Sequence, residues 1–174
     1  ASAYMDLAQS TRDPRIAKRA AEIAAFSRQN EIALQAAQLW LEVDPESVQA
    51  RQMLSGLLVN ANRPQELEPQ LVSLLAQEGA QIGESLLRLN RVLARLSDKA
   101  EVLRMVDRLT EPYLMHPEAY FARAQAAMLA REPKRALESA SRAHEMRPEW
   151  EAGLLLKAQA TAESDQRAAH DLMA

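Results

Sequence analysis

One spacing recurs along this chain and constrains its fold more than any other feature. The same offset of 103 residues separates three pairs of matching residues: Ala33 and Ala136, Pro45 and Pro148, and Pro14 and Pro117. Three periods of about 34 residues give nearly this offset, and 34 residues is the length of one common type of helix-pair repeat. The spacing therefore predicts a repeat protein with two further units between the matching ones.

Two positions mark the units that lie between. The small, buried position of each unit is expected at Ala33, Leu67, Ala100 and Ala136. The position that ends the second helix of each unit is expected at Pro45, Gly79, Pro112 and Pro148. Glycine and proline both end helices readily, glycine because it adopts a positive φ and proline because it has no N–H to donate.

Composition points to helices alone. The chain has 174 residues, only 4 glycines and 4% aromatic residues. Alanine, leucine, arginine, glutamine and glutamate dominate it, and these are the strongest helix formers. We therefore predict an all-α protein. The absence of cysteine excludes disulfides and thiol chemistry.

Each unit is predicted to be a pair of antiparallel helices, because the polar breaks between them are short. The expected pairs are 14–26 with 30–43, 46–60 with 64–78, 81–96 with 98–111, and 117–130 with 133–146. The units themselves span 14–47, 48–80, 81–116 and 117–150, with partial units at 1–13 and 151–174. Helices are expected in these partial units at 2–11, 149–162 and 165–173. Both ends cut through repeats, which predicts that 1–174 is one array from a longer chain.

Proline and aspartate predict where several helices begin. Asp13-Pro14 and Asp44-Pro45 place an N-cap carboxylate before a proline at the first helical position. Pro64 and Pro133 are expected to open second helices in the same way. Pro69 lies just beyond the first turn of its helix, so it should kink that helix or delay its start.

The pattern of small and aromatic residues resembles the tetratricopeptide repeat (TPR). Residues 117–150 match best, with Tyr120, Ala124, Ala136, Ala140, Ala143 and Pro148 at the consensus positions. Residues 14–47 match through Ala21, Ala33, Ala37 and Pro45, although Ala17 replaces the aromatic residue and Trp40 a small one. Units two and three depart further, with Leu67, Gly79 and Arg88 at consensus positions. The resemblance implies an α-solenoid that winds as a right-handed superhelix; the alternative is a plain alanine-rich bundle.

A narrower resemblance concerns residues 3–45, which contain the run "TRDPRIAKRAAEIA". This segment is similar to proteobacterial multi-repeat TPR lipoproteins, which lie on the periplasmic side of the outer membrane. Some members of that group are adaptors for a carboxyl-terminal processing protease. The resemblance thus implies a periplasmic lipoprotein adaptor, with a cytoplasmic location as the alternative.

In TPR arrays, partners bind a concave groove lined by repeat positions 2, 5, 9 and 12 of each first helix. The residues expected there are Arg15, Lys18, Glu22 and Ala25; Gln49, Gln52, Gly56 and Val59; Ile82, Ser85, Leu89 and Val92; and Glu118, Phe121, Gln125 and Met128. This set suits an extended peptide or a partner helix. Leu89, Phe121 and Met128 would be apolar anchors, and Gln49 and Gln52 would bond the peptide backbone.

Some TPR proteins clamp a C-terminal carboxylate in this groove. Lys18 fits the first lysine position of that clamp. Glu22 occupies the asparagine position, however, where its charge would repel a carboxylate. The clamp is therefore disfavoured.

The sequence nominates no catalytic, metal or cofactor site. The three histidines, His116, His144 and His170, lack the i, i+3 or i+4 partners that place two metal ligands on one helix face. No Ser/His/Asp spacing and no glycine-rich phosphate loop stands out. We expect a non-enzymatic protein without a cofactor, in which the histidines are surface or capping residues.

Charge and hydropathy narrow the partners further. A formal net charge of −3 argues against nucleic acid, which basic proteins bind, and no apolar run approaches the length of a membrane span. Apolar residues nearly encircle the first helix of unit three: Leu86, Leu87, Leu89, Val92, Leu93 and Leu96. That helix is either buried between neighbours or part of an interface with another copy or with further repeats.

Three functions stay open at this point. The first is a protein-binding scaffold or adaptor, including the protease adaptor. The second is a scaffold for envelope assembly, such as pilus or secretion machinery. The third is the repeat region of a larger enzyme with its catalytic domain elsewhere.

Overall fold

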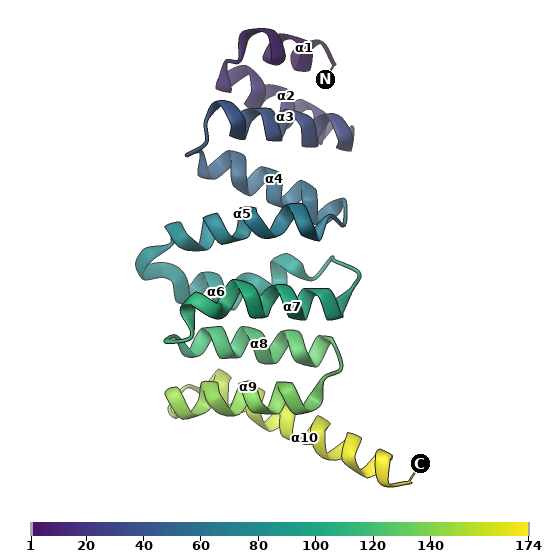
Figure 1. Ribbon diagram of the computed structural model, residues 1–174, viewed down its shortest axis with the longest axis vertical. Coiled ribbons are helices and arrows are strands. Elements are labelled where there is room, and N and C mark those ends of the chain that lie inside the picture. The colour runs from purple at the N-terminus through teal and green to yellow at the C-terminus, as the bar shows by residue number, and fades with distance from the viewer. Residues whose placement is uncertain (1, 174) are drawn as a thin grey trace. The chain divides into compact units, whose positions relative to one another are not determined.

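The computed structural model describes the backbone of residues 2–173 and the side chains of residues 2–167. Ten α-helices and two short 3₁₀ turns make up this part of the chain, which contains no strand (Figure 1). The protein is therefore all-α, as its composition predicts. It is a helical solenoid of consecutive, packed helix pairs, with the TPR-like pattern of one pair per repeat.

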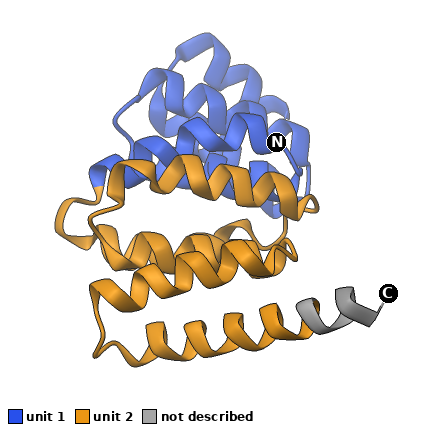
Figure 2. Cartoon of the chain, turned by 60° about the horizontal axis from the view of Figure 1, so that its bottom comes forward, with its two compact units in different colours: residues 1–77 blue, residues 78–174 orange. Residues whose placement is uncertain are grey.

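The chain divides into two compact units, residues 1–77 and 78–174, which Figure 2 colours separately. Unit 1 contains α1 (Ser2–Thr11), α2 (Pro14–Phe26), α3 (Asn30–Val43), α4 (Val48–Asn60) and α5 (Pro64–Gln77). Each of these helices packs against the next along the chain. That both units belong to one continuous array stays a prediction.

Unit 2 contains α6 (Ile82–Leu93), α7 (Lys99–Thr110), α8 (Pro117–Leu129), α9 (Pro133–Met146) and α10 (Glu151–Met173), with 3₁₀ turns η1 (Gly79–Gln81) and η2 (Glu111–Tyr113). Helix α8 packs against α6, α7, α9 and α10, whereas α6 and α7 touch only sparingly. The first helices of successive repeats, α6, α8 and α10, are thus neighbours in sequence order within this unit.

Most helix boundaries agree with the predicted ones, and three local predictions need correction. Asp44-Pro45 does not open α4, because Ser47 is its N-cap and accepts a hydrogen bond from the Ala50 N–H. Pro69 lies inside α5 without delaying its start at Pro64. In place of two helices at 149–162 and 165–173 there is the single helix α10, Glu151–Met173, since no glycine or proline interrupts 154–173.

Three first helices, α2, α4 and α8, end in the same way. In each, the residue two beyond the C-cap donates its N–H to a carbonyl five residues back, as Gln29 does to Ala24 and Glu132 to Ala127. The residue before it has a positive φ: 55° at Arg28, 54° at Asn62 and 59° at Arg131. This is the Schellman motif, and it turns the chain back within three residues. Helix α6 ends differently and has a longer link to α7.

Burial corrects the register of the third repeat, predicted at 81–116. Ala100 and Arg88, placed at the small positions by sequence, are both exposed. The buried residues aligned with the small positions are Ala21, Ser55, Asn90 and Ala124 in the first helices, and Ala33, Leu67, Val102 and Ala136 in the second. Successive members of each set are 34, 35 and 34 residues apart. The additional residue lies in the link around Gly79, which has a φ of 51°.

Candidate partner-binding surface

Repeat positions 2, 5, 9 and 12 of the first helices define the surface to be tested, here called the A-helix face. In unit 1, three of its charged residues are engaged locally. The Arg15 guanidinium pairs with the Asp13 carboxylate at 2.7 Å, and this hydrogen bond lowers the pKa of Asp13 to about 2. Glu22 pairs with Arg19 at 3.3 Å.

Lys18 is held between two neighbours. Its ammonium donates to Gln49 Oε1 at 3.2 Å and lies 5.5 Å from the ring centre of Trp40. Trp40 is itself buried, so the lysine covers the ring from the solvent side. This arrangement gives Lys18 an ordinary packing role, besides the one proposed for it in partner binding.

The face of α4 is polar. Gln49, Gln52 and Gly56 are exposed, whereas Val59 is buried. The structure therefore leaves Gln52 accessible for the predicted bonds to a peptide backbone, while Gln49 already accepts from Lys18.

In the third repeat, the corrected register changes which residues lie on the A-helix face. Leu89 is only 3% exposed and Ile82 is buried, so both belong to the core. Leu89 was expected as an anchor, but it takes the same repeat position as Leu54, which is also buried. Ser85 is half-buried and Val92 exposed.

The residues two positions further along now occupy the face. They are Glu84, Leu87, Arg91 and Ala94, and all four are exposed. Of the apolar residues that encircle α6, Leu86, Leu89, Leu93 and Leu96 are buried. Leu87 and Val92 face solvent, so this helix is neither fully buried nor uniformly exposed.

In the fourth repeat (117–150), Phe121 is held by a series of contacts. Its ring lies 4.8 Å from that of Trp150 at a tilt of 38°. Arg147 stacks over Trp150 at 5.2 Å and forms an ion pair of 2.7 Å with Glu118, which is buried. Gly153 leaves room for the indole, since a Cβ there would lie 3.0 Å from Trp150 Cε3. Phe121 is therefore held in place while it stays half-exposed.

The other predicted residues of α8, Gln125 and Met128, are also half-exposed. Gln125 accepts a weak hydrogen bond of 3.3 Å from Asn90 of α6, and the same Asn90 amide donates to the Ala122 carbonyl at 2.8 Å. Asn90 Oδ1 is buried and has no partner among the described residues.

In unit 2, repeat position 5 of every first helix carries an apolar side chain. Leu87 of α6, Phe121 of α8 and Leu155 of α10 are separated by equal steps of 34 residues. Leu87 is 36% and Leu155 59% exposed. We call these three residues the apolar ladder. The sequence predicts Leu87 only as part of the apolar ring around its helix, and it does not single out Leu155. Aligning the repeats on their helix starts brings both into register with Phe121.

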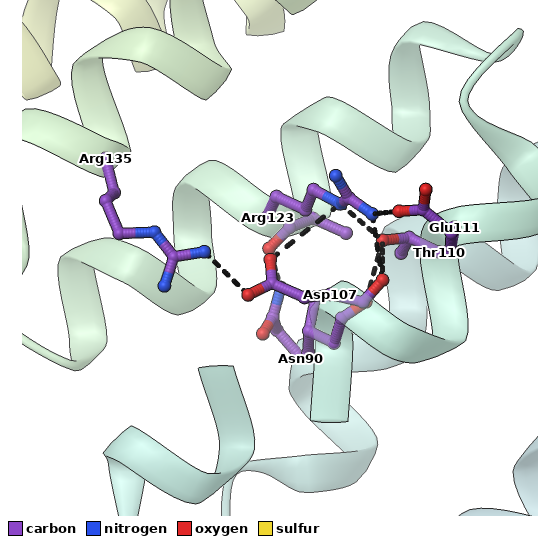
Figure 3. Close-up of polar contacts among 8 residues, drawn as sticks. Asn90, Asp107, Thr110, Glu111, Arg123 and Arg135 are labelled. Carbon is purple, nitrogen blue, oxygen red and sulfur yellow. Dashed lines mark hydrogen bonds and ion pairs between the residues drawn. The ribbon is translucent and has the colours of Figure 1, made fainter. Parts of the chain in front are cut away.

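In unit 2, a polar network joins α7, η2, α8 and α9 (Figure 3). Arg123 donates from Nε to Thr110 Oγ1 at 2.7 Å and from Nη2 to the Asp107 carbonyl at 2.8 Å, and it pairs with Glu111 at 2.6 Å. Arg135 pairs with the Asp107 carboxylate at 2.6 Å. Arg123 is largely buried, and Thr110 fully so. Because the charges of this network are paired with one another, we assign it a structural role: it holds α8 against α7.

The remaining features offer no alternative centre. His144 Nδ1 is buried and has no hydrogen-bond partner within the described residues, and the side chain of His170 lies outside them. Across residues with described side chains, no cluster of three His, Cys, Asp or Glu is placed to hold a metal ion. No helix in the described part of the chain has both the length and the apolar character needed to cross a membrane.

No family model and no curated protein matches this chain. Among solved structures, it is similar to the crystal structure of PilW, a widely conserved type IV pilus biogenesis factor. The two share 19% sequence identity at a TM-score of 0.47, over 94% of this chain and 78% of PilW. Similarity at this level says nothing about function.

Proposed function

We propose that this chain is a non-enzymatic protein-interaction scaffold, which binds a partner protein or an extended peptide through its A-helix face. The observation that carries the proposal is the apolar ladder of unit 2. Two of its three side chains are exposed at the same repeat position, and the third, Phe121, is held half-exposed by Trp150. Exposed apolar side chains gathered on one surface mark interaction sites more often than scattered ones do.

Other residues of the A-helix face, on each unit separately, suit such a partner. Gln125 and Met128 are half-exposed on α8, and Gln52 is exposed on α4. Amide side chains can bond a peptide backbone, while a few apolar anchors supply most of the affinity. In unit 1, Arg15, Lys18, Glu22 and Gln49 would contribute polar contacts.

The test is affinity capture with the whole gene product and with the double variant Phe121→Ala/Met128→Ala. Loss of the partners that the unmodified protein captures is expected. The matched control is Met115→Ala/Leu154→Ala, which truncates two exposed apolar residues away from positions 2, 5, 9 and 12. Capture of the same partners at undiminished yield by the Phe121/Met128 variant would end the proposal.

Partner identity forms a second layer of the proposal. The resemblance of residues 3–45 to periplasmic TPR lipoproteins makes a carboxyl-terminal processing protease the first partner to test. Envelope assembly is the next, and a larger enzyme containing this repeat region is the third. The whole gene product separates them: a signal peptide, a lipidation cysteine and repeats alone favour the adaptor. A separate domain bearing a Gly-rich loop or a His/Asp site favours the enzyme.

A further inference from the structure

The spacing of the apolar ladder says more about the partner than the presence of a surface does. Leu87, Phe121 and Leu155 lie on α6, α8 and α10, and α8 packs against both of the other helices. Axes of packed helices are about 8–10 Å apart. Side chains at one repeat position on successive helices are therefore expected at intervals of about 8–10 Å.

Only some peptide conformations place side chains on one face at that interval. A polyproline II helix has three residues per turn and rises about 3.1 Å per residue, so residues i, i+3 and i+6 share a face at steps of about 9.3 Å. In a β-strand, residues i and i+3 point to opposite faces. An α-helix comes nearest to the interval with residues seven apart, at about 10.5 Å.

The row next to the ladder favours the extended peptide over the helix. Position 9 carries Arg91, Gln125 and Gln159, of which the first and last are exposed. These side chains offer hydrogen-bond donors one turn along from the apolar ladder. A polyproline II backbone has free carbonyls to accept from them, whereas the backbone of an α-helix is bonded internally.

Charge gives the peptide one more feature. Arg91 forms no ion pair with any other described residue, while the nearby Glu84 pairs with Arg88 at 3.8 Å. An unpaired guanidinium at the α6 end of the row favours a carboxylate on the partner.

We infer that unit 2 binds an extended, polyproline II-like peptide with apolar side chains at i, i+3 and i+6 and an acidic residue beside the one that contacts Leu87. This inference rests on the proposed function, because it names the partner chemistry of the same surface. Phe121 contacts the central apolar residue, and Leu87 and Leu155 contact the outer two.

The probe is a fluorescein-labelled nine-residue peptide with leucine at positions 1, 4 and 7, glutamate at 2 and proline at 3 and 6. Its affinity for the full chain is measured by fluorescence anisotropy. A peptide of the same composition with leucine at 1, 3 and 5 is expected to bind at least about tenfold more weakly, because at least one of its leucines is then left in water. Equal affinity for the two peptides overturns the inference.

Two variants of adjacent residues localise the binding. Leu154 and Leu155 are similarly exposed, at 52% and 59%, but only Leu155 is on the ladder. Leu155→Gln should weaken binding of the 1, 4, 7 peptide by about tenfold, whereas Leu154→Gln should leave it within about twofold. Losses of the same size in both variants contradict the inference.

Other occupants give their own results. Tighter binding of a helical peptide with leucine at 1, 8 and 15 means that the partner is a helix. A dimer in light scattering that Leu155→Gln dissolves means that a second copy covers the ladder. Either result overturns the inference. If partner capture depends on Phe121 and Met128 but no 1, 4, 7 peptide binds, the inference fails while the proposed function stands.

Discussion

The Glu118 carboxylate pairs with the Arg147 guanidinium at 2.7 Å, and through it supports Trp150 and Phe121. Glu118 is buried, whereas Arg147 keeps contact with water. Glu118→Gln should lower the free energy of unfolding by about 1–2 kcal/mol, because a charge-assisted hydrogen bond is lost at a partly buried site. Urea denaturation measures this loss.

A double-mutant cycle with Arg147→Gln provides the control for that prediction. If the ion pair is the cause, Glu118→Gln should cost clearly less once Arg147 is already glutamine. The same cost in both backgrounds would show that the pair contributes nothing.

The corrected register of the third repeat predicts that substitutions at two residues only two positions apart change stability by very different amounts. Ala100→Leu should change stability by less than about 0.5 kcal/mol, because Ala100 is exposed. Val102→Ala should cost about 1–3 kcal/mol through the cavity it leaves, since Val102 is buried. Ala136→Leu, at the matching position of unit four, should cost about 1–3 kcal/mol by overpacking. A large effect at Ala100 with none at Val102 would restore the original register.

The repeated Schellman turns predict stabilising substitutions. Arg28 and Arg131 have positive φ values of 55° and 59°, which glycine adopts without a steric cost. Arg28→Gly and Arg131→Gly should each raise the free energy of unfolding by about 0.5–1 kcal/mol, because the steric cost of the left-handed backbone at arginine exceeds the entropic cost of glycine. Gln35→Gly, at an exposed site inside α3, should instead lower it by about 1 kcal/mol. Thermal melting compares the three, and destabilisation by both turn substitutions would contradict the turn geometry.

The capping residue of α2 predicts a pH dependence. The hydrogen bond from Arg15 lowers the pKa of Asp13 from 3.8 to about 2. Because the folded pKa is the lower one, the stabilisation is fully present above 3.8 and is lost as the pH falls through about 2. The protein should therefore be more stable than Asp13→Asn at pH 6, and this difference should disappear between about pH 4 and 2.

Arg15→Gln is the matched background for the pH experiment. Without the guanidinium, the difference between aspartate and asparagine at position 13 should shrink at pH 6. Thermal melting over the pH series gives both comparisons. A difference that persists unchanged at pH 2 would rule out the proposed ionic origin.

The fold was predictable because the residues that mark the repeat directly restrict the structure: prolines begin helices, and small alanines allow helices to pack closely. Pro14, Pro64 and Pro133 open helices where they were expected to, and the buried alanines of α8 and α9 have the predicted spacing. The register of the third repeat was not predictable from Ala100, because alanine suits an exposed helix position as well as a buried one. Only burial distinguishes it from Val102.

Whether the A-helix face binds a partner stays a prediction, but the exposure of its residues was predictable on α8, where the sequence matches the repeat consensus best. Phe121 and Met128 are half-exposed on α8, at positions assigned from the best-matching repeat. Leu89 was misassigned because leucine lines cores and interfaces alike, and because the step into the third repeat is 35 residues (Leu67 to Val102) rather than the expected 33 (Leu67 to Ala100). The contact of Phe121 with Trp150 joins α8 to the link between α9 and α10, and no local pattern in the sequence encodes such a contact.

Site-specific photocrosslinking tests the central claim most directly. A benzoylphenylalanine placed at Gln125, on the A-helix face of α8, is compared with one at Glu138, exposed on α9. The scaffold proposal predicts that the bound partner crosslinks from position 125 and not from position 138. Crosslinking from position 138 alone would place the partner on the second helices and contradict the proposal.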